Sequence, residues 1–296
     1  MEHQSIAIVG FGDIGQRLCG CLPPRWRAVA LRRRAREVPA GVRGVAVDLR
    51  DPPSLACLER LAPDALLVTL SPAERSAEGY RAGFAAAMQH ILAGLGGHRP
   101  RRAFFLSSTR VYAETEGGWV DEDSPLAADD PHAAAIIEAE RRLLDALPGA
   151  VVLRAGGLYG AGPGPLLRAV AAGRLRPREP VLYGNRLHRD DVAGFLAHCL
   201  EKGLEAGPGE DRVINLVDDG CVPQQEVEAW LCEQLRRPYE PPAAVAEPPP
   251  RHKRVRNARL HATGYDLRFP DYRSGYGDVL RQWVRHSERE DGLDLH

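Results

Sequence analysis

The hydrophobic positions of the first half of the chain fall into two alternating patterns. Short continuous apolar runs are typical of strands buried on both faces, and apolar residues three and four positions apart are typical of helices. The expected strands are Ser5–Val9, Trp26–Leu31, Val42–Val47, Ala65–Leu70, Ala103–Ser107 and Val151–Arg154. The expected helices are Ile14–Leu22, Pro53–Leu61, Ala73–Leu95 and Ala133–Leu147. Strands that alternate with helices predict right-handed crossovers and a parallel sheet covered on both faces.

The alternation weakens after about residue 155, where a glycine- and proline-rich loop begins. The elements expected beyond it are helices at Leu166–Ala172, Asp190–Leu200 and Gln224–Leu235, a strand at Val213–Leu216, and an irregular connection at Pro238–Pro250. We therefore predict an α/β fold in which residues 1–155 form a doubly wound Rossmann domain. Residues 156–286 would form a smaller C-terminal α/β substrate lobe that can return elements to the Rossmann sheet, and 287–296 a frayed tail.

A glycine-rich segment follows the first expected strand and begins the first expected helix. It reads Gly10-Phe11-Gly12-Asp13-Ile14-Gly15, a GxGxxG pattern. Gly10 permits a tight turn, Gly12 lets the backbone approach a pyrophosphate, and Gly15 lets helix and strand pack closely. The helix N-terminus then presents free N–H groups to the phosphates. The segment predicts a dinucleotide site with contacts from Gly10, Gly12, Asp13, Ile14 and Gly15, the alternative being a merely tight turn.

The residues after the second strand bear on which dinucleotide is bound. An NAD site normally has Asp or Glu about 20 residues after the first glycine, to accept from the ribose 2′-hydroxyl. Here the strand ends in Arg32-Arg33-Arg34. Guanidinium groups of Arg32 and Arg33 can pair with a 2′-phosphate, so NADP(H) is favoured over NAD(H), with a solvated basic turn as the alternative. Asp48, after the third strand, either accepts from the adenine amino group or caps a helix.

Composition narrows the function classes. The 39 basic and 40 acidic residues give a formal net charge of −1, so nothing draws the chain generally to nucleic acid or to an anionic membrane. No apolar run reaches about 18 residues, and the first residues lack the pattern of a signal peptide. The six cysteines include no CxxC pair. We expect a cytoplasmic protein without nucleic acid or membrane partners and without a metal site.

Short motifs beyond the glycine segment resemble one known family. Ser107-Ser108-Thr109-Arg110-Val111-Tyr112 ends the fifth strand, and Leu153-Arg154, Gly157-Leu158-Tyr159-Gly160 and Asn185–Val192 follow. With the glycine segment, their order and spacing resemble the extended short-chain dehydrogenases, the NAD(P)-dependent epimerase/dehydratase family, over about residues 5–285. The resemblance implies an active site between a Rossmann domain and a C-terminal substrate lobe. By position, Ser108 matches the catalytic Ser or Thr of that family.

The chain departs from this family at its catalytic pair. The family uses Tyr-x-x-x-Lys, in which the phenol is the acid/base and the lysine lowers its pKa and holds the nicotinamide ribose. This chain has only two lysines, Lys202 and Lys253, and His198 and Pro249 stand four residues before them. No Tyr-x-x-x-Lys therefore exists in the chain. The other 37 of its 39 basic residues are arginines.

The helix that should carry the pair shows what replaces it. In the register anchored on Glu140, His132 falls at the tyrosine position and Ile136 at the lysine position. Imidazole groups titrate near neutral pH, so His132 is a candidate proton shuttle, with Ser108 binding the substrate oxygen. The alternative for His132 is a residue of the first helical turn without chemistry.

Two functions from different classes follow. The first is an NAD(P)-binding epimerase/dehydratase-type oxidoreductase that acts on a nucleotide sugar or a small carbonyl or hydroxyl compound with a non-standard acid/base. The second is a cofactor-binding sensor or scaffold that has lost catalysis. Loss of the Tyr and Lys positions with an intact glycine segment is what the second predicts.

Further residues are expected on the substrate side. Tyr112 is either an acid or a side chain packed beside the cofactor, and Arg154 and Tyr159 either shape the cleft or have a structural role. The resemblance, more than the residues themselves, implies that His188 and Arg189 face a phosphate or carboxylate of the substrate. Asp190 or Asp191 is expected to cap the helix that follows. The expected partner is a small-molecule substrate, and a homodimer stays open.

Overall fold

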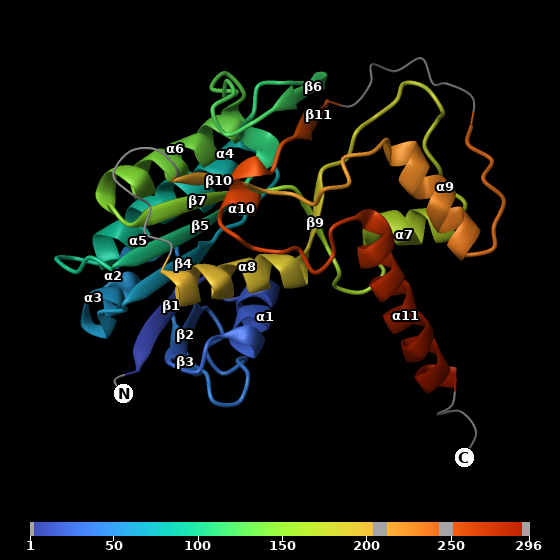
Figure 1. The fold of residues 1–296 in the computed structure, drawn as a ribbon. Coiled ribbons are helices and arrows are strands. Elements are labelled where there is room, and N and C mark those ends of the chain that lie inside the picture. Colours follow the sequence, from blue (N-terminus) through green and yellow to red (C-terminus); the bar gives the residue numbers. More distant parts are fainter. Residues whose placement is uncertain (1–2, 204–211, 243–250, 292–296) are drawn as a thin grey trace.

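A seven-stranded parallel sheet organises the computed structural model, which describes residues 3–203, 212–242 and 251–291 (Figure 1). The strands run in the order β10-β7-β5-β4-β1-β2-β3. Their bounds are Val213–Leu216 (β10), Ala150–Ala155 (β7), Arg102–Ser108 (β5), Ala65–Thr69 (β4), Gln4–Val9 (β1), Trp26–Arg32 (β2) and Arg43–Ala46 (β3). The order reverses between β1 and β4, as it does in doubly wound Rossmann folds, so the predicted fold class is confirmed.

Helices cover both faces of this sheet because the side chains of each strand alternate between them. In β1, Ala7 and Val9 join one buried cluster, and Ile6 and Ile8 join the other. The first face is covered by α2 (Pro52–Leu55), α3 (Cys57–Leu61), α4 (Ala77–Tyr80), α5 (Ala87–Gly94) and α6 (Pro131–Ala146). The second is covered by α1 (Asp13–Cys21), α8 (Arg189–Lys202) and α10 (Ala258–Ala262).

The C-terminal lobe begins where the chain leaves the carboxyl end of β7. It consists of α7 (Gly164–Ala171), α9 (Gln224–Gln234), α11 (Tyr272–Asp291) and the two-stranded pair β8 (Gly157–Tyr159) and β9 (Arg186–His188) (Figure 1). The three helices share an apolar cluster that includes Leu167, Leu231 and Tyr272. Between these elements the chain returns to the large sheet through α8 and β10, which pairs with β7.

Two helices differ from the sequence-based expectation. The helix predicted over Ala73–Leu95 begins only at Ala77, because the Ser76 side chain caps α4 by accepting from the Gly79 N–H. It then continues through a π-helical segment, Arg81–Ala86, into α5. The helix predicted over Pro53–Leu61 is divided into α2 and α3.

A small second sheet was not predicted. It pairs β6 (Glu116–Val120) with β11 (His252–Val255) in parallel, over a separation of more than 130 residues that local patterning cannot reveal. At the C-terminus, α11 reaches Asp291, so the segment expected to be frayed is helical up to that residue, and 292–296 lie outside the described residues. Of the expected irregular connection, residues 243–250 also lie outside them. Within the described ranges, no helix has the length and apolar character needed to cross a membrane.

A buried polar network joins β5, α6 and β7 under the carboxyl edge of the sheet. Arg154 and Glu140 are 4% and 3% exposed, and Arg154 Nη2 lies 2.8 Å from Glu140 Oε2. The Ser107 hydroxyl donates to Glu140 Oε1, and Arg154 Nη1 donates to the Tyr112 hydroxyl oxygen and the Glu122 carbonyl, both at 3.2 Å. Every charge in the network therefore has several partners, which a buried ion pair requires.

We expect Arg154→Leu to lower the free energy of unfolding by about 3–5 kcal/mol, because it leaves the Glu140 carboxylate buried without its cation. Urea denaturation at neutral pH measures the change. The matched control is Arg142→Leu on the solvent side of α6, where the Arg142–Glu138 pair is partly exposed and contributes about 0–1 kcal/mol. Equal losses in the two variants would contradict the assignment.

Candidate dinucleotide and substrate site

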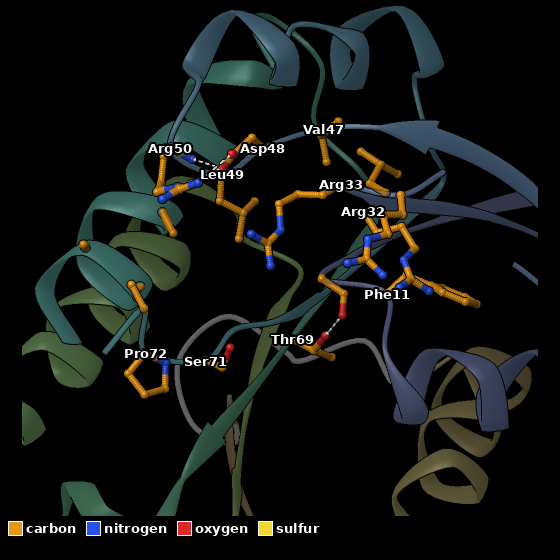
Figure 2. Close-up of a pocket in the computed structure, with 17 residues that line it drawn as sticks. Phe11, Arg32, Arg33, Val47, Asp48, Leu49, Arg50, Thr69, Ser71 and Pro72 are labelled. Atoms are coloured by element: carbon orange, nitrogen blue, oxygen red, sulfur yellow. Dashed lines mark hydrogen bonds and ion pairs between the residues drawn. The ribbon is translucent and has the colours of Figure 1, made fainter. Parts of the chain in front are cut away.

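A pocket of about 700 Å³ lies at the carboxyl ends of β1, β2, β3 and β4 (Figure 2). In open parallel sheets, ligands bind at such a position, where the strand order reverses. Its walls come from Gly10–Phe11, Leu31–Arg34, Val47–Arg50 and Thr69–Ala73, with Ala82, Gly83 and Ala87 closing one side. The pocket therefore joins the glycine segment and the arginine turn that the sequence singled out.

The three glycines of the segment have different surroundings. Gly10 has φ +81°, and a Cβ there would lie 2.0 Å from the Thr69 carbonyl oxygen, while the Thr69 hydroxyl donates to the Gly10 carbonyl at 2.6 Å. A Cβ on Gly15 would lie 2.8 Å from the Phe11 ring. Gly12 is different, because a Cβ there meets only the Gly10 carbonyl oxygen, at 3.7 Å. As N-cap of α1, Gly12 supplies no side-chain cap, so the helix N-terminus keeps its N–H groups for a ligand.

The side chains of Asp13 and Ile14 face the protein. Ile14 is buried in the core, and the Asp13 carboxylate accepts from Arg17 Nε at 2.9 Å and from Arg189 Nη1 at 3.0 Å. Partial burial alone would raise the pKa of Asp13, but the two guanidinium groups outweigh it and lower the pKa. At these two positions only the backbone remains available to a phosphate.

The three arginines at the end of β2 differ in how they are paired. Arg32 donates to the Glu37 carboxylate at 2.9 Å and to the Glu37 carbonyl at 2.6 Å, and Arg34 donates to the same carboxylate at 3.1 Å. Arg33 has no hydrogen-bond or ion-pair partner in the part of the chain that the structure describes. Its exposed side chain extends into the pocket from the end of β2 (Figure 2). The unpaired guanidinium at the pocket is thus that of Arg33.

Asp48 also lines the pocket, and its carboxylate is held by Arg50, whose Nη2 and backbone N lie 3.1 and 3.0 Å from it. These hydrogen bonds lower the pKa of Asp48. The interpretation of Asp48 as a helix cap was wrong, because Asp51 is the N-cap of α2.

The opposite wall, from Ser71 to Ala73 and Gly83, was missed by the sequence analysis. The sequence feature that could have indicated this wall is Gly83, a glycine within an expected helix. In the structure a Cβ on Gly83 would lie 2.4 Å from the Ser71 carbonyl oxygen, so the close approach of the two segments requires glycine.

Ser108 and His132 lie on two elements that meet beyond β5. The Ser108 hydroxyl accepts from the Arg110 N–H at 3.2 Å and caps a short 3₁₀ turn, Thr109–Val111. His132 is in the first turn of α6, where Nδ1 lies 3.3 Å from Asp130 Oδ1 and Nε2 lies 3.2 Å from the Arg75 carbonyl oxygen. Both ring nitrogens of His132 therefore have partners in the protein.

Ile136, at the position of the missing lysine, is 1% exposed and packs in the core between α6 and the sheet. A charged side chain has no place there, because it would have to be desolvated without a partner.

Tyr112 and Arg154, expected at the cleft, belong to the buried network. The Tyr112 side chain is 1% exposed, and its hydroxyl donates to Asn215 Oδ1 at 2.5 Å. Burial raises the pKa of the Tyr112 phenol, although Arg154 opposes the shift. The buried side chains of Tyr112 and Arg154 therefore support the loop that follows β5.

His188 and Arg189 join the C-terminal lobe to the glycine segment. His188 is fully buried and caps α8, since its Nδ1 accepts from the Asp190 N–H at 3.2 Å. The expectation that Asp190 or Asp191 forms the cap was therefore wrong. Arg189 of α8 pairs with Asp13 of α1, and Arg17 of α1 pairs with Asp190 of α8. Two ion pairs therefore connect these helices.

Tyr159 lies in a buried polar cluster with His188 and Asp218. The Tyr159 ring stacks on Tyr276 with centroids 4.6 Å apart and meets His188 edge-on at 5.3 Å. The Tyr159 hydroxyl, His188 Nε2 and Asp218 Oδ2 are buried without a hydrogen-bond partner among the described residues. Burial raises the pKa of Asp218 to about 7, although Arg186 opposes the shift. Burial also raises the pKa of Tyr159 and lowers that of His188.

Comparisons with known proteins agree with this architecture. Protein YeeZ of Escherichia coli K12 is 30% identical over 252 residues, which cover 81% of this chain and 86% of the relative. A Methylobacillus flagellatus structure assigned as an NAD-dependent epimerase/dehydratase is 33% identical, with a TM-score of 0.78 over 94% of this chain and 98% of the other. WbmG of Bordetella bronchiseptica, solved with NAD, shares the fold at 15% identity, with a TM-score of 0.76 over 96% and 95% of the two chains. No family model matches the chain.

The sheet order, the glycine segment at the reversal point and the C-terminal lobe define an extended Rossmann fold of the short-chain dehydrogenase type. With these relatives, the chain belongs to the NAD-dependent epimerase/dehydratase family. It is an atypical member, because it has no Tyr-x-x-x-Lys.

We expect Gly12→Ala to fold with little change in thermal unfolding and to weaken NADPH binding at least about tenfold, or about 1.4 kcal/mol. The added methyl group fits the protein but occupies the place where the backbone approaches a pyrophosphate. Titration of NADPH fluorescence measures the affinity. The comparison variant is Gly15→Ala, which should instead lower stability by crowding Phe11. Unchanged affinity in Gly12→Ala would place the phosphates elsewhere.

Asp218 should make the stability of the protein depend on pH. Its folded-state pKa of about 7 lies above the ordinary value of 3.8, so its contribution to stability is full below about pH 4 and is lost as pH rises through 7. We expect wild type to lose a few kcal/mol relative to Asp218→Asn over this window, at about 1.4 kcal/mol for each pH unit. Urea denaturation at pH 5 and pH 8 measures the difference, and parallel pH dependences of the two proteins would exclude it.

Proposed function

We propose that this protein is an NADP(H)-dependent oxidoreductase or epimerase-type enzyme. Its substrate is a small molecule with a reacting hydroxyl or carbonyl group, either a nucleotide sugar or a simpler compound. The observation that carries the proposal is the pocket of about 700 Å³ at the reversal point of the sheet, which joins the glycine segment to an unpaired arginine. The NAD bound by WbmG, which shares the fold, supports a nicotinamide dinucleotide as the ligand.

The residues present fit such a dinucleotide. The backbone from Gly10 to Gly15 would hold the pyrophosphate at the N-terminus of α1, since Gly12 leaves open space where a side chain would intrude. Val47 and Leu49 line the pocket beside Asp48 and suit an adenine ring. When bound, the nicotinamide would supply the hydride acceptor or donor, and Ser108 would bind the substrate oxygen.

Arg33 favours the phosphorylated cofactor. Arg32 and Arg34 both pair with Glu37, whereas Arg33 has no hydrogen-bond or ion-pair partner among the described residues and lines the pocket. Among the residues that line the pocket, the one acid, Asp48, already accepts hydrogen bonds from Arg50. A guanidinium pairs with a 2′-phosphate through strong, charge-assisted hydrogen bonds.

Wild-type protein should bind NADPH more tightly than NADH, and Arg33→Ala should weaken NADPH binding by about 10- to 100-fold, as expected for a hydrogen bond to a charged group. Affinity for NADH should change little. Arg34→Ala is the matched control, since Arg34 is exposed and already paired. Fluorescence titration measures all three proteins, and equal NADPH and NADH affinities in wild type would refute the preference.

The sensor alternative also uses the cofactor pocket, and the buried Ile136 in place of the family lysine favours it. Turnover separates the two functions. The enzyme should oxidise NADPH with at least one member of a panel of sugar nucleotides, ketones and aldehydes. A protein that binds NADPH and never oxidises it across the panel is a sensor or scaffold.

A further inference from the structure

Two arginines from distant parts of the chain meet at one carboxylate beside the loop that follows β5. Arg110 is in the 3₁₀ turn after Ser108, and Arg251 directly precedes β11. Arg110 Nη2 lies 3.3 Å from Asp130 Oδ2, and Arg251 Nη1 lies 3.5 Å from the same oxygen. The two guanidinium groups are therefore close together, although they are far apart in the sequence.

The Asp130 carboxylate has a second task at the N-terminus of α6. Its Oδ1 accepts from the backbone N–H groups of His132 at 2.9 Å and Ala133 at 3.4 Å, and so caps the helix. One oxygen thus serves the helix, and only the other faces the two arginines. A single carboxylate shared in this way leaves the pair of guanidinium groups with an excess of positive charge.

The neighbouring charges keep this excess. A lysine is close enough to both arginines for their charges to act on it, and one glutamate acts on it as well. The positive groups of the cluster are therefore Arg110, Arg251 and Lys253, and the negative ones Asp130 and Glu114. The side chains of Arg110 and Arg251 are 44% and 73% exposed, so a ligand can reach them. A guanidinium has several N–H donors, of which one shared oxygen can accept only a few.

One aromatic ring fixes the direction of the Arg110 guanidinium. Its Cζ lies over the Tyr80 ring, 5.5 Å from the centroid, and the His132 ring meets the same tyrosine edge-on at 4.7 Å. Because His132 Nδ1 also lies 3.3 Å from Asp130 Oδ1, the guanidinium and the imidazole share two neighbours. The arginine is thus held beside the candidate proton shuttle.

This cluster touches both the candidate catalytic loop and the wall of the cofactor pocket. The Arg110 N–H donates to the Ser108 hydroxyl at 3.2 Å. On the other side, His132 Nε2 lies 3.2 Å from the carbonyl oxygen of Arg75. Arg75 is two residues beyond Ser71–Ala73, which line the pocket. The excess positive charge therefore lies where a substrate at Ser108 would meet it.

We propose that Arg110 and Arg251 bind an oxyanion group of the substrate, a carboxylate or a phosphate, next to the hydroxyl or carbonyl group held by Ser108. The proposal rests on the proposed function and narrows its substrate to an anionic small molecule. Guanidinium groups hold carboxylates and phosphates by paired, charge-assisted hydrogen bonds, which fix the orientation of the ligand as well as its position.

The residues that the sequence suggested for an anionic group are already occupied. Arg189 pairs with Asp13, and His188 is fully buried. The competing role for Arg110 and Arg251 is structural, as ion pairs that only hold Asp130 at the start of α6. Exposed ion pairs of this kind contribute little to stability, so ligand binding separates the two roles.

The first test measures anion binding without turnover, by NMR of protein labelled with ¹⁵N in histidine. His132→Gln assigns the His132 ring signals. Saturating NADP⁺ fills the cofactor pocket, and inorganic phosphate or oxalate is added at constant ionic strength. At least one anion should shift the His132 signals in a saturable way, and both Arg110→Gln and Arg251→Gln should weaken its binding at least about tenfold.

Arg142→Gln is the matched control, because Arg142 is also a partly exposed arginine paired with an acid of α6. It should bind the anion as wild type does. A response to phosphate alone would identify a phosphate-bearing substrate, and a response to oxalate alone a carboxylic acid. No saturable shift with either anion, or equal affinities in wild type, Arg110→Gln and Arg251→Gln, would overturn the proposal.

The second test compares NADPH oxidation by anionic compounds and their neutral counterparts. The pairs are 2-keto acids with their amides, and sugar phosphates with the unphosphorylated sugars. Wild type should favour the anionic members by about 10- to 100-fold in kcat/KM. Arg110→Gln should remove this preference, chiefly through a higher KM, and should leave kcat/KM for the neutral members unchanged. Equal kcat/KM values within every pair in wild type would contradict the proposal.

The outcomes distinguish this inference from the function on which it rests. Turnover in wild type without any preference for anions would overturn the inference and leave the proposed function standing. Saturable anion binding at His132 without turnover of any compound would refute the enzyme function and leave the anion site standing, as the ligand site of a sensor.

Discussion

The buried ion pair between Glu140 and Arg154 is the constraint on which the rest of the site depends. Two charges removed from water are stable only when their remaining protons and lone pairs also have partners, and Ser107, Tyr112 and the Glu122 carbonyl provide these. The pair joins α6 to β7, and the hydroxyl groups of Ser107 and Tyr112 connect it to β5 and to the loop that follows β5. In this register Ile136 faces the core, so α6 supports the site but cannot supply its cation.

A second set of charges ties the glycine segment to the C-terminal lobe. Arg17 on α1 pairs with Asp190 and donates to the Gly160 carbonyl, while Arg189 on α8 returns to Asp13. The helix whose N-terminus would receive the phosphates is therefore held by the first turn of α8. These ion pairs connect the cofactor pocket to the C-terminal lobe. They also account for the side chains of Asp13 and Arg189, which pair with each other.

Much of the fold followed from the sequence, because strands buried on both faces and helices with one apolar face leave strong periodic signals. The glycine segment was recognisable because backbone geometry alone demands glycine at Gly10. The pairing of β6 with β11 left no local signal, and neither did the choice among Arg32, Arg33 and Arg34, which depends on where the Glu37 carboxylate points.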